Sequence, residues 1–358
     1  MLEKRVIVAM SGGVDSAVAA AFLKEKGYDV IGVSMRFSDD SGSHAKAQDL
    51  RDARAVADTL DIPLEVLDLR SDFRNRIMTY FVSSYLQGRT PNPCALCNPT
   101  IKFHSLIQKA DALSAVYVAT GHYAKVSHDP TSGRFLLRRG TERGKDQSYF
   151  LARLGQDVLQ RTLFPIGSFS KTKIRQYATR FGLPVAQKTE SQEACFIPDG
   201  DVISFIRKEN ADANQPGEIQ DEKGCVLGEH GGIAGFTIGQ RKGLGIALGH
   251  PVYISRIDAK TNTITVGKDT ALYHQGLTAA HPNWIAVDGL REPIRADTRI
   301  RYKHRPRPAT LTPHEDGSIH IRFDQPQRAI TPGQLAVFYD RDVVIGSAWI
   351  QNIVEGET

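Results

Sequence analysis

The sequence is poor in cysteine and has no long apolar run, and each shortage excludes a class of protein. Four cysteines among 358 residues are too few for a disulfide-stapled scaffold. No apolar stretch approaches the roughly 20 residues that a membrane-spanning helix requires. The opening residues, Met-Leu-Glu-Lys-Arg, lead directly into an expected strand, without the apolar core of a signal peptide. We therefore expect a cytoplasmic protein that has no membrane partner.

The net charge is only +5, and its distribution along the chain is more informative than its sum. Basic clusters that are separated in sequence can form one face for a polyanion. Three groups hold many of the basic residues: Arg299, Arg301, Lys303, His304, Arg305 and Arg307; Arg138, Arg139, Arg143 and Lys145; and Arg241 with Lys242. These groups predict a basic face on the folded protein.

No lysine follows the glycines of the most informative segment, which excludes a Walker A site. An apolar run at residues 6–10 leads into Ser-Gly-Gly-Val-Asp-Ser at 11–16, and helical periodicity follows. Gly12 and Gly13 have no Cβ, so the backbone can turn tightly and let a phosphate approach its amides. Asp15 can cap the helix or help to hold Mg²⁺. The segment predicts a phosphate-binding loop at a helix N-terminus.

Strand and helix signals alternate over the N-terminal third of the chain. Strands are expected at residues 6–10, 30–35, 64–69 and 116–120, and helices at 15–26, 50–60, 73–86 and 101–113. This alternation predicts an α/β domain with a parallel, doubly wound sheet, in which ligands bind beyond the carboxyl ends of the strands. The loop at 11–16, Met35 and Gly121 all lie at such ends.

The remainder of the chain becomes richer in strands. A hairpin is expected at 124–139, helices at 158–163, 171–181 and 201–208, and strands from about residue 217 onward, including 319–323 and 335–339. The length suggests two or three domains. We expect a nucleotide-binding α/β domain at 1–198, a small β-rich domain at 199–274 and a C-terminal β-barrel at 275–358.

Three of the four cysteines are candidates for chemistry. Cys94 and Cys97 form a Cys-x-x-Cys pair, which we place on a loop stiffened by two prolines. Such a pair suits a metal, an iron–sulfur cluster or redox exchange. No second Cys-x-x-Cys or spaced histidine pair is found, which disfavours structural zinc. Cys195 lies at the expected domain boundary, where a loop can move and hand over a group, whereas we expect Cys225 to be structural.

Seven motifs follow one another along nearly the whole chain. They are Ser-Gly-Gly-Val-Asp-Ser (11–16), Gly-Arg-Thr-Pro-Asn-Pro (88–93), Ala-Thr-Gly-His-Tyr (119–123), Lys-Asp-Gln-Ser-Tyr-Phe (145–150), Cys-Phe-Ile (195–197), Gly-Gln-Arg-Lys-Gly-Leu-Gly (239–245) and Thr-Pro-Gly-Gln (331–334). In this order they resemble the bacterial tRNA-specific 2-thiouridylases, which belong to the PP-loop, or N-type ATP pyrophosphatase, superfamily. The resemblance implies that ATP, with Mg²⁺, adenylates the C2 oxygen of the wobble uridine (position 34) of tRNA. Sulfur borne by a cysteine then attacks C2, and AMP leaves.

The resemblance also assigns roles to single residues. It implies a nucleotide site made of Ala9, Met10, Ser11, Gly12, Gly13, Val14, Asp15, Ser16, Met35 and Gly121. Cys97 matches the family's nucleophile, and Cys195 matches the cysteine that receives sulfur as a persulfide from a relay donor protein or a cysteine desulfurase. It implies tRNA contacts, part of them on the C-terminal barrel, at His122, Lys145, Asp146, Gln147, Arg301, Tyr302 and Gln334.

One residue departs from the family pattern and leaves the sulfur chemistry open. Many members have an aspartate where this chain has Cys94, and a thiol does not replace a carboxylate as a general acid or base. The alternative is that Cys94, Cys97 and Cys195 hold a [4Fe–4S] cluster whose open iron carries the sulfur. A remoter alternative is another PP-loop tRNA-modifying ligase, and a third is a nucleotide-dependent RNA-binding protein without catalysis.

Overall fold

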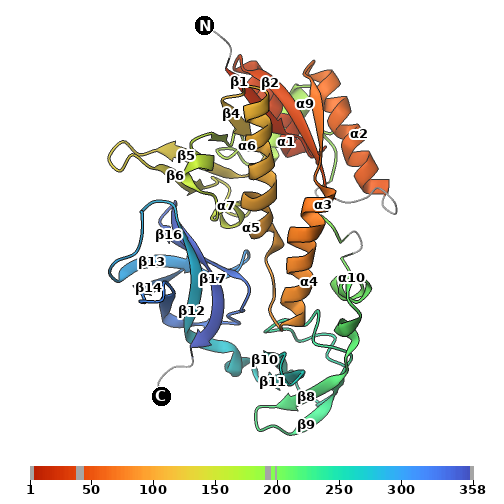
Figure 1. Cartoon of the computed structure of the whole chain (residues 1–358), viewed down its shortest axis with the longest axis vertical. Helices are drawn as coiled ribbons and strands as arrows, with labels where there is room; N and C mark the ends of the chain where they lie inside the picture. Colours follow the sequence, from red (N-terminus) through yellow and green to blue (C-terminus); the bar gives the residue numbers. More distant parts are fainter. Residues whose placement is uncertain (1–3, 38–43, 190–194, 198–199, 355–358) are drawn as a thin grey trace.

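The computed structural model describes residues 4–37, 44–189, 195–197 and 200–354, which form an α/β part, a small β-rich part and a barrel (Figure 1). The first part is built on five parallel strands in the order β3-β2-β1-β4-β7. These strands are β1 (Arg5–Ala9), β2 (Asp29–Arg36), β3 (Leu64–Asp68), β4 (Tyr117–Ala119) and β7 (Thr162–Leu163). The predicted doubly wound parallel sheet is therefore confirmed.

Helices cover both faces of this sheet because successive side chains of a strand point to opposite sides. Val6 and Val8 of β1 pack in one cluster with residues of α1 (Val14–Glu25), α2 (His44–Thr59) and α9 (Lys171–Arg180). Ile7, between the two valines, packs on the other face with α6 (Phe103–Ala112). The apolar run at 6–10 is thus buried on both sides, as a central parallel strand requires.

The Cys-x-x-Cys pair lies on a helix, and its predicted placement on a loop was wrong. The helix begins at α5 (Pro93–Cys97), continues through the π-helical turn η2 (Asn98–Lys102) and runs into α6. Asn92 caps it, because its Oδ1 accepts a hydrogen bond from the backbone N–H of Ala95 at 3.2 Å. A capping asparagine followed by proline at the first helical position is a helix start. The stiffness of the two prolines favours a loop only when this capping signal is left out of account.

A second long helical rod stands beside this one (Figure 1) and is interrupted in the same way. It comprises α3 (Arg70–Phe73), the π-helical turn η1 (Arg74–Met78) and α4 (Thr79–Leu86), close to the predicted 73–86. Short helices α7 (Ser148–Leu151) and α8 (Gln156–Leu159) follow later. The predicted helix at 158–163 was wrong beyond Leu159, because α8 ends there and Thr162 and Leu163 pair with β4 as the edge strand β7.

The middle part begins with α10 (Val202–Glu209), which confirms the helix expected at 201–208. A 3₁₀ turn, η3 (Ala211–Asn214), leads into a four-stranded sheet of order β10-β11-β8-β9. Its strands are β8 (Gly217–Asp221), β9 (Val226–His230), β10 (Tyr253–Asp258) and β11 (Thr263–Gly267), and a second 3₁₀ turn, η4 (Asp269–Leu272), follows them. A small core around Ile219, Ile254 and Ile264 holds this sheet together.

The C-terminal part is a closed barrel, as predicted. Its strands are β12 (Tyr273–Trp284), β13 (Ile294–Arg299), β14 (Arg307–Pro313), β15 (Ile319–Arg328), β16 (Leu335–Asp340) and β17 (Val343–Val354). The barrel closes because β12 pairs with both β15 and β17. Its interior is filled by apolar side chains such as those of Leu277, Ile321 and Phe338, which are all fully buried.

Two of the features that join the α/β part to the barrel are a hairpin and a loop. The predicted hairpin, β5 (Ala124–His128) and β6 (Phe135–Arg139), is confirmed, and it extends the barrel sheet where Arg138 pairs with Val343 of β17. The loop that precedes α5 is the other link: Thr90 donates its N–H to Pro332 O at 3.0 Å. The hydroxyl of Thr90 also lies 3.0 Å from that of Thr237 in the middle part. The loop before the two cysteines therefore touches both other parts.

Within the described residues, no helix combines the length and the apolar character needed to cross a membrane.

Candidate active site

The loop at 11–16 curls over the N-terminus of α1, and its geometry requires glycine at residue 12. Gly12 has φ +71°, and a Cβ there would lie 2.1 Å from the carbonyl oxygen of Asp49 in α2. The Ser16 hydroxyl fastens the loop to the helix, since it donates to Gly13 O at 3.1 Å and accepts from Ser11 N–H at 3.2 Å. The amides at the start of α1 are thus available to an anion.

Gly121 brings the end of β4 against this loop. A Cβ at Gly121 would lie 2.6 Å from the amide nitrogen of Ser16. The strand order turns in opposite directions on either side of β1 and β4, which makes the space beyond their carboxyl ends the usual ligand site of such sheets. The predicted nucleotide residues Gly121 and 11–16 therefore meet beyond the carboxyl ends of β1 and β4.

Other predicted nucleotide residues lie in or at the edge of the core. Met10 and Val14 are buried, so these two positions can offer only main-chain groups to a ligand. Ala9, at the end of β1, and Met35, near the end of β2, are partly buried. The Met35 side chain packs against the apolar cluster that contains Cys97, which places this end of β2 between the loop and the thiols.

A lysine from far along the chain lies at the loop. The ammonium of Lys171, the first residue of α9, is 2.8 Å from each carboxylate oxygen of Asp15. The hydroxyl of Tyr123 also donates to Asp15 Oδ1 at 2.8 Å. Asp15 was predicted to cap the helix or to help hold Mg²⁺; Gly13 occupies the N-cap position, and no cap hydrogen bond from a side chain forms there.

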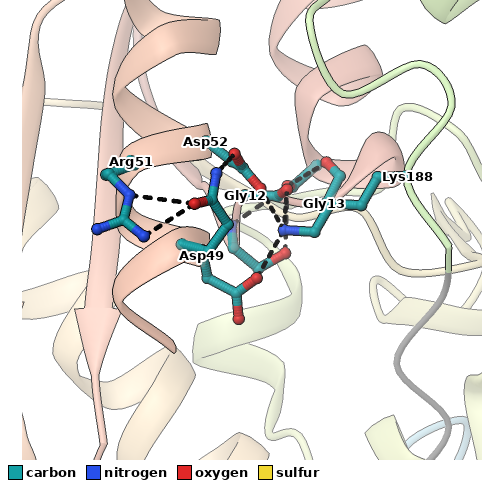
Figure 2. A network of polar contacts seen from close by, with 9 residues as sticks. Gly12, Gly13, Asp49, Arg51, Asp52 and Lys188 are labelled. Carbon is teal, nitrogen blue, oxygen red and sulfur yellow. Dashed lines mark hydrogen bonds and ion pairs between the residues drawn. The ribbon is translucent and has the colours of Figure 1, made fainter. Parts of the chain in front are cut away.

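A second lysine braces the loop from the side of α2 (Figure 2). Lys188 Nζ donates to Gly12 O at 3.1 Å, Asp49 Oδ1 at 2.6 Å and Asp52 Oδ2 at 2.5 Å. Burial opposes the charge on Lys188, but the hydrogen bonds and charges of the two aspartates outweigh it and raise the pKa of the lysine. The ammonium therefore stays charged and ties the loop to α2.

Sequence reasoning missed both lysines because they lie 156 and 176 residues from their partners in the loop. No spacing rule reaches across such a separation. The one available signal was that the loop contains no lysine. A phosphate-binding loop without its own cation needs one from another part of the fold, so a distant lysine could have been expected.

The three candidate cysteines gather at the N-terminal end of the α5–η2 helix. Cys97 is buried, whereas Cys94 and Cys195 are exposed. Burial raises the pKa of Cys97 to about 12, against the opposing charge of Lys102, and the neighbouring thiols of Cys195 and Cys94 raise it further. Phe196, next to Cys195, packs in the same cluster as Cys97, with its ring 5.0 Å from that of Phe81. The fold thus brings together thiols that are 98 residues apart.

His122 follows Gly121 and packs on the helix that carries Cys97. Its Nδ1 lies 2.8 Å from the hydroxyl of Thr120, and its ring stacks on Phe103 with centroids 6.2 Å apart. Burial, with a smaller contribution from the charge of Lys102, lowers the pKa of His122 to about 3. The imidazole is therefore neutral at physiological pH, and it packs on Phe103, the residue after Lys102 in the helix that carries Cys97.

The thiols do not form a ready cluster site. Among the residues that the structure describes, no three histidine, cysteine or acidic side chains lie close enough together to hold a metal ion. Cys94, Cys97 and Cys195 share a neighbourhood but not the arrangement that three thiolate ligands of one [4Fe–4S] cluster require. The arrangement therefore fits two or three separate thiols better than a cluster.

The predicted tRNA segment at 145–147 has one residue that faces inward. The Asp146 carboxylate is 1% exposed, accepts from the N–H groups of Gly140 and Ser148 at 3.1 Å each, and pairs with Arg139. Gln147 Oε1 accepts from Tyr123 N–H at 2.8 Å. Asp146 thus holds the turn in shape, and Lys145, which is half-buried, lies on its outer side.

The basic face expected at 299–307 lacks one of its members. Arg299 is 7% exposed and pairs with Asp146 at 3.4 Å, so its prediction as part of an outer face was wrong. Alternation along β13 puts Arg299 on the same face as the exposed Arg295, and it is buried because Asp146 and Tyr149 of the α/β part lie against it. Lys303, Arg305 and Arg307 are exposed, in keeping with a basic surface.

The predicted tRNA residues of the barrel lie where it meets the α/β part. Arg301 Nη1 donates to Arg328 O at 2.9 Å, and the Tyr302 ring lies 4.5 Å from that of Phe150. The Gln334 amide donates to the carbonyls of Thr90 and Pro91 at 3.1 Å each. Gln334 therefore contacts the loop that leads to Cys94.

Comparison with known proteins decides the family. The profile described as the tRNA methyl transferase HUP domain matches residues 4–199, and profiles of a PRC-barrel domain and an aminomethyltransferase beta-barrel domain match 204–268 and 274–350. A protein of Acetivibrio thermocellus named tRNA-specific 2-thiouridylase MnmA is 45% identical over 359 residues, covering 98% of this chain and 100% of that protein. The chain belongs to the tRNA-specific 2-thiouridylase family.

A second relative and one solved structure are also similar to this chain. The 2-thiouridylase of Geotalea uraniireducens is 47% identical over 366 residues, covering 99% of this chain and 97% of its own. Among solved structures, a 4-thiouridine synthetase–RNA complex with bound ATP aligns with a TM-score of 0.36 at 17% identity, covering 58% of this chain and 51% of its own. The identity to the two 2-thiouridylases confirms the resemblance of the seven motifs over nearly the full length.

Proposed function

We propose that this protein replaces the C2 oxygen of the wobble uridine, position 34, of tRNA with sulfur in an ATP-dependent reaction. The observation that carries the proposal is the juxtaposition of the phosphate loop with the cysteines: Gly121 touches the loop, and the ring of the next residue, His122, stacks on Phe103 in the continuous helix that carries Cys97. Relatives that are 45% and 47% identical over nearly the full length bear the name of this activity.

The first step is adenylation of the base. The uridine C2 oxygen attacks the α-phosphorus of ATP, pyrophosphate leaves, and the oxygen becomes part of AMP, a far better leaving group. The proposed nucleotide site comprises residues 9–16, Met35 and Gly121, in which the amides at the start of α1 bind phosphate oxygens. Mg²⁺, when bound, neutralises phosphate charge, and Asp15 is the carboxylate placed to reach it.

The second step transfers sulfur from cysteine. A persulfide on Cys195, received from a sulfur-relay protein or a cysteine desulfurase, attacks C2 through its terminal sulfur and expels AMP. The Cys97 thiolate then attacks the Cys195 sulfur, which releases 2-thiouridine and leaves a Cys97–Cys195 disulfide. The two thiols thereby supply the two electrons that reduce the sulfane sulfur, and a cellular thiol restores them. The exposure of Cys195 suits it to receive sulfur from outside.

The three parts divide the work in this proposal. Residues 1–198 carry the nucleotide site and the thiols, 199–274 form the small central domain, and 275–358 form the barrel that binds tRNA. The proposed tRNA contacts are His122, Lys145, Gln147, Arg301, Tyr302 and Gln334, with Asp146 acting by holding its neighbours. Phosphate contacts from the basic surface make the binding weaken as salt rises.

Reconstituted thiolation tests the proposal. The purified protein is incubated with ATP, a tRNA transcript and a persulfide donor, and the digested nucleosides are analysed by mass spectrometry. We expect 2-thiouridine and release of pyrophosphate, both dependent on tRNA and ATP. Cys97→Ser abolishes 2-thiouridine, whereas Cys225→Ser, which changes an exposed thiol in the middle part, leaves it unchanged. Pyrophosphate release that depends on tRNA, yields no 2-thiouridine and survives Cys97→Ser would point to another PP-loop ligase instead.

Iron analysis separates the persulfide route from the cluster route. The protein is purified without oxygen, and iron and acid-labile sulfide are measured alongside thiolation, in the wild type and in Cys94→Ala. Full thiolation by iron-free protein supports the persulfide. Thiolation that requires near-stoichiometric iron, with both lost in Cys94→Ala, would overturn the persulfide step.

A further inference from the structure

The phosphate loop needs a cation that its own sequence does not supply. A triphosphate carries several negative charges, and backbone amides with a helix dipole balance only part of them. In a Walker A loop a lysine directly after the glycines meets this need, and here that position holds no lysine. The fold brings Lys171 and Lys188 to the loop instead, from two opposite sides.

The two lysines differ in where they stand. Lys188 lies on the α2 side and donates to three protein acceptors, one of them the carbonyl of Gly12, so it is a brace within the loop. Lys171 lies on the β4 side, where Asp15 comes from the start of α1 and Tyr123 from the segment after β4. This is the side of the carboxyl ends of β1 and β4, where the strand order reverses and sheets of this kind bind their ligands.

We propose that Lys171 is the phosphate-binding lysine of this site, and that it exchanges the Asp15 carboxylate for the outer phosphates of ATP when the nucleotide binds. The inference rests on the proposed use of ATP and adds the residue that recognises its charge. The Asp15 carboxylate holds the ammonium in place before the nucleotide arrives, and once released it would be free to hold a Mg²⁺ ion that accompanies the phosphates.

The surroundings of Lys171 suit such an exchange. The residue is 8% exposed, and an ammonium so placed needs an anionic partner, which a phosphate oxygen can provide as well as a carboxylate oxygen. Its backbone is fixed, because its N–H donates to Glu142 Oε2 at 2.5 Å and the Ser170 hydroxyl caps α9. The long side chain can therefore change partner by rotation about its own bonds while the helix stays in place.

Binding of two nucleotides that differ in phosphate number tests the inference. Calorimetric titrations with MgATP and with AMP are compared for the wild type and Lys171→Met, in the absence of tRNA. Loss of a charge-assisted contact to the outer phosphates should weaken MgATP binding by about 10- to 100-fold. Affinity for AMP should change less than about two-fold, because AMP lacks those phosphates. Lys173→Met, which removes a charge two residues along the same helix, serves as the matched control.

The outcomes separate binding from structure. An equal loss for MgATP and AMP, or no loss for either, overturns the inference, because a collapsed loop would affect both nucleotides alike. Lys171→Arg, which keeps the charge, should restore part of the MgATP affinity. A wild type that binds MgATP but fails to thiolate tRNA would overturn the proposed function and leave Lys171 as assigned. A thiolating enzyme whose Lys171→Met variant binds MgATP normally would overturn this inference alone.

Discussion

At the scale of single residues, Gly12 is the position where one added carbon atom conflicts most directly with the proposed chemistry. Its φ of +71° disfavours any other residue, and the added Cβ of alanine would lie 2.1 Å from the backbone oxygen of Asp49. Since backbone cannot swing aside like a side chain, the loop has to shift. We expect Gly12→Ala to lower ATP-dependent thiolation by about 100-fold, as displacements near 1 Å do in catalytic sites.

Gly133 offers a matched control for that variant. Its φ is +68°, and nothing lies within 4 Å of the site of a Cβ. Gly133→Ala should therefore lower the free energy of unfolding by about 1 kcal/mol through backbone strain and leave thiolation unchanged. If Gly12→Ala and Gly133→Ala retained similar activity, the loop at 11–16 would not position the reacting nucleotide.

His122 makes stability depend on pH. Its folded-state pKa of about 3 lies below the ordinary value of about 6.5, so on acidification the unfolded chain binds the proton first. The stabilising contribution is complete above that ordinary pKa and is lost as the pH falls toward 3. From pH 7.5 to 5.0 we expect the free energy of unfolding to drop by about 2 kcal/mol through this residue. Urea titrations of wild type and His122→Phe should show a shallower drop in the variant, and equal slopes would contradict the assignment.

At the scale of elements, the helix that carries Cys94 and Cys97 shows what local sequence signals can and cannot decide. The apolar spacing predicted only its later part, α6, because the two prolines favour a loop when they are considered alone. The Asn92–Pro93 pair was the available sign of an earlier start. The π-helical turn η2 had no such sign, since it depends on tertiary packing against α7, where the Asn98 amide donates to Phe150 O at 2.9 Å.

Removal of the helix cap at Asn92 should make the Cys97 thiol more accessible. Asn92→Ala takes the acceptor from the N–H of Ala95, which should lower the free energy of unfolding by about 1 kcal/mol or more. Because burial keeps the pKa of Cys97 at about 12, its alkylation by iodoacetamide is slow in the wild type and should become faster as the helix start frays. Asp201→Ala removes the corresponding cap of α10 and should leave Cys97 reactivity unchanged. Equal rates in both variants would show that Asn92 does not protect Cys97.

At the scale of the whole molecule, the order of the parts could be predicted but their contacts could not. Alternating strands indicated a barrel, and the motifs gave its place in the chain. Nothing in the local pattern indicated that Thr90 would meet Thr237 and Pro332, because these contacts span 147 residues or more. For the same reason the charged segment at 299–307 was interpreted as one surface, although the pairing of Arg299 with the buried Asp146 turns that residue inward.

The loop before Cys94 therefore predicts an energetic coupling between the two smaller parts. Thr237, in the middle part, contacts Thr90. Gln351, in the barrel, accepts a hydrogen bond from Arg89 through its Oε1 at 2.8 Å. Thr237→Val removes a contact to Thr90, and Gln351→Ala removes a contact to the neighbouring Arg89. When thiolation rates are converted to activation free energies, the effect of the double variant should differ from the sum of the single effects by about 0.5 kcal/mol or more. Thr237→Val combined with Asp324→Ala, which breaks an exposed barrel ion pair with Arg295, should be additive. Additive effects in both pairs would mean that the loop does not couple the middle part to the barrel, because the loss of one contact would then leave the effect of losing the other unchanged.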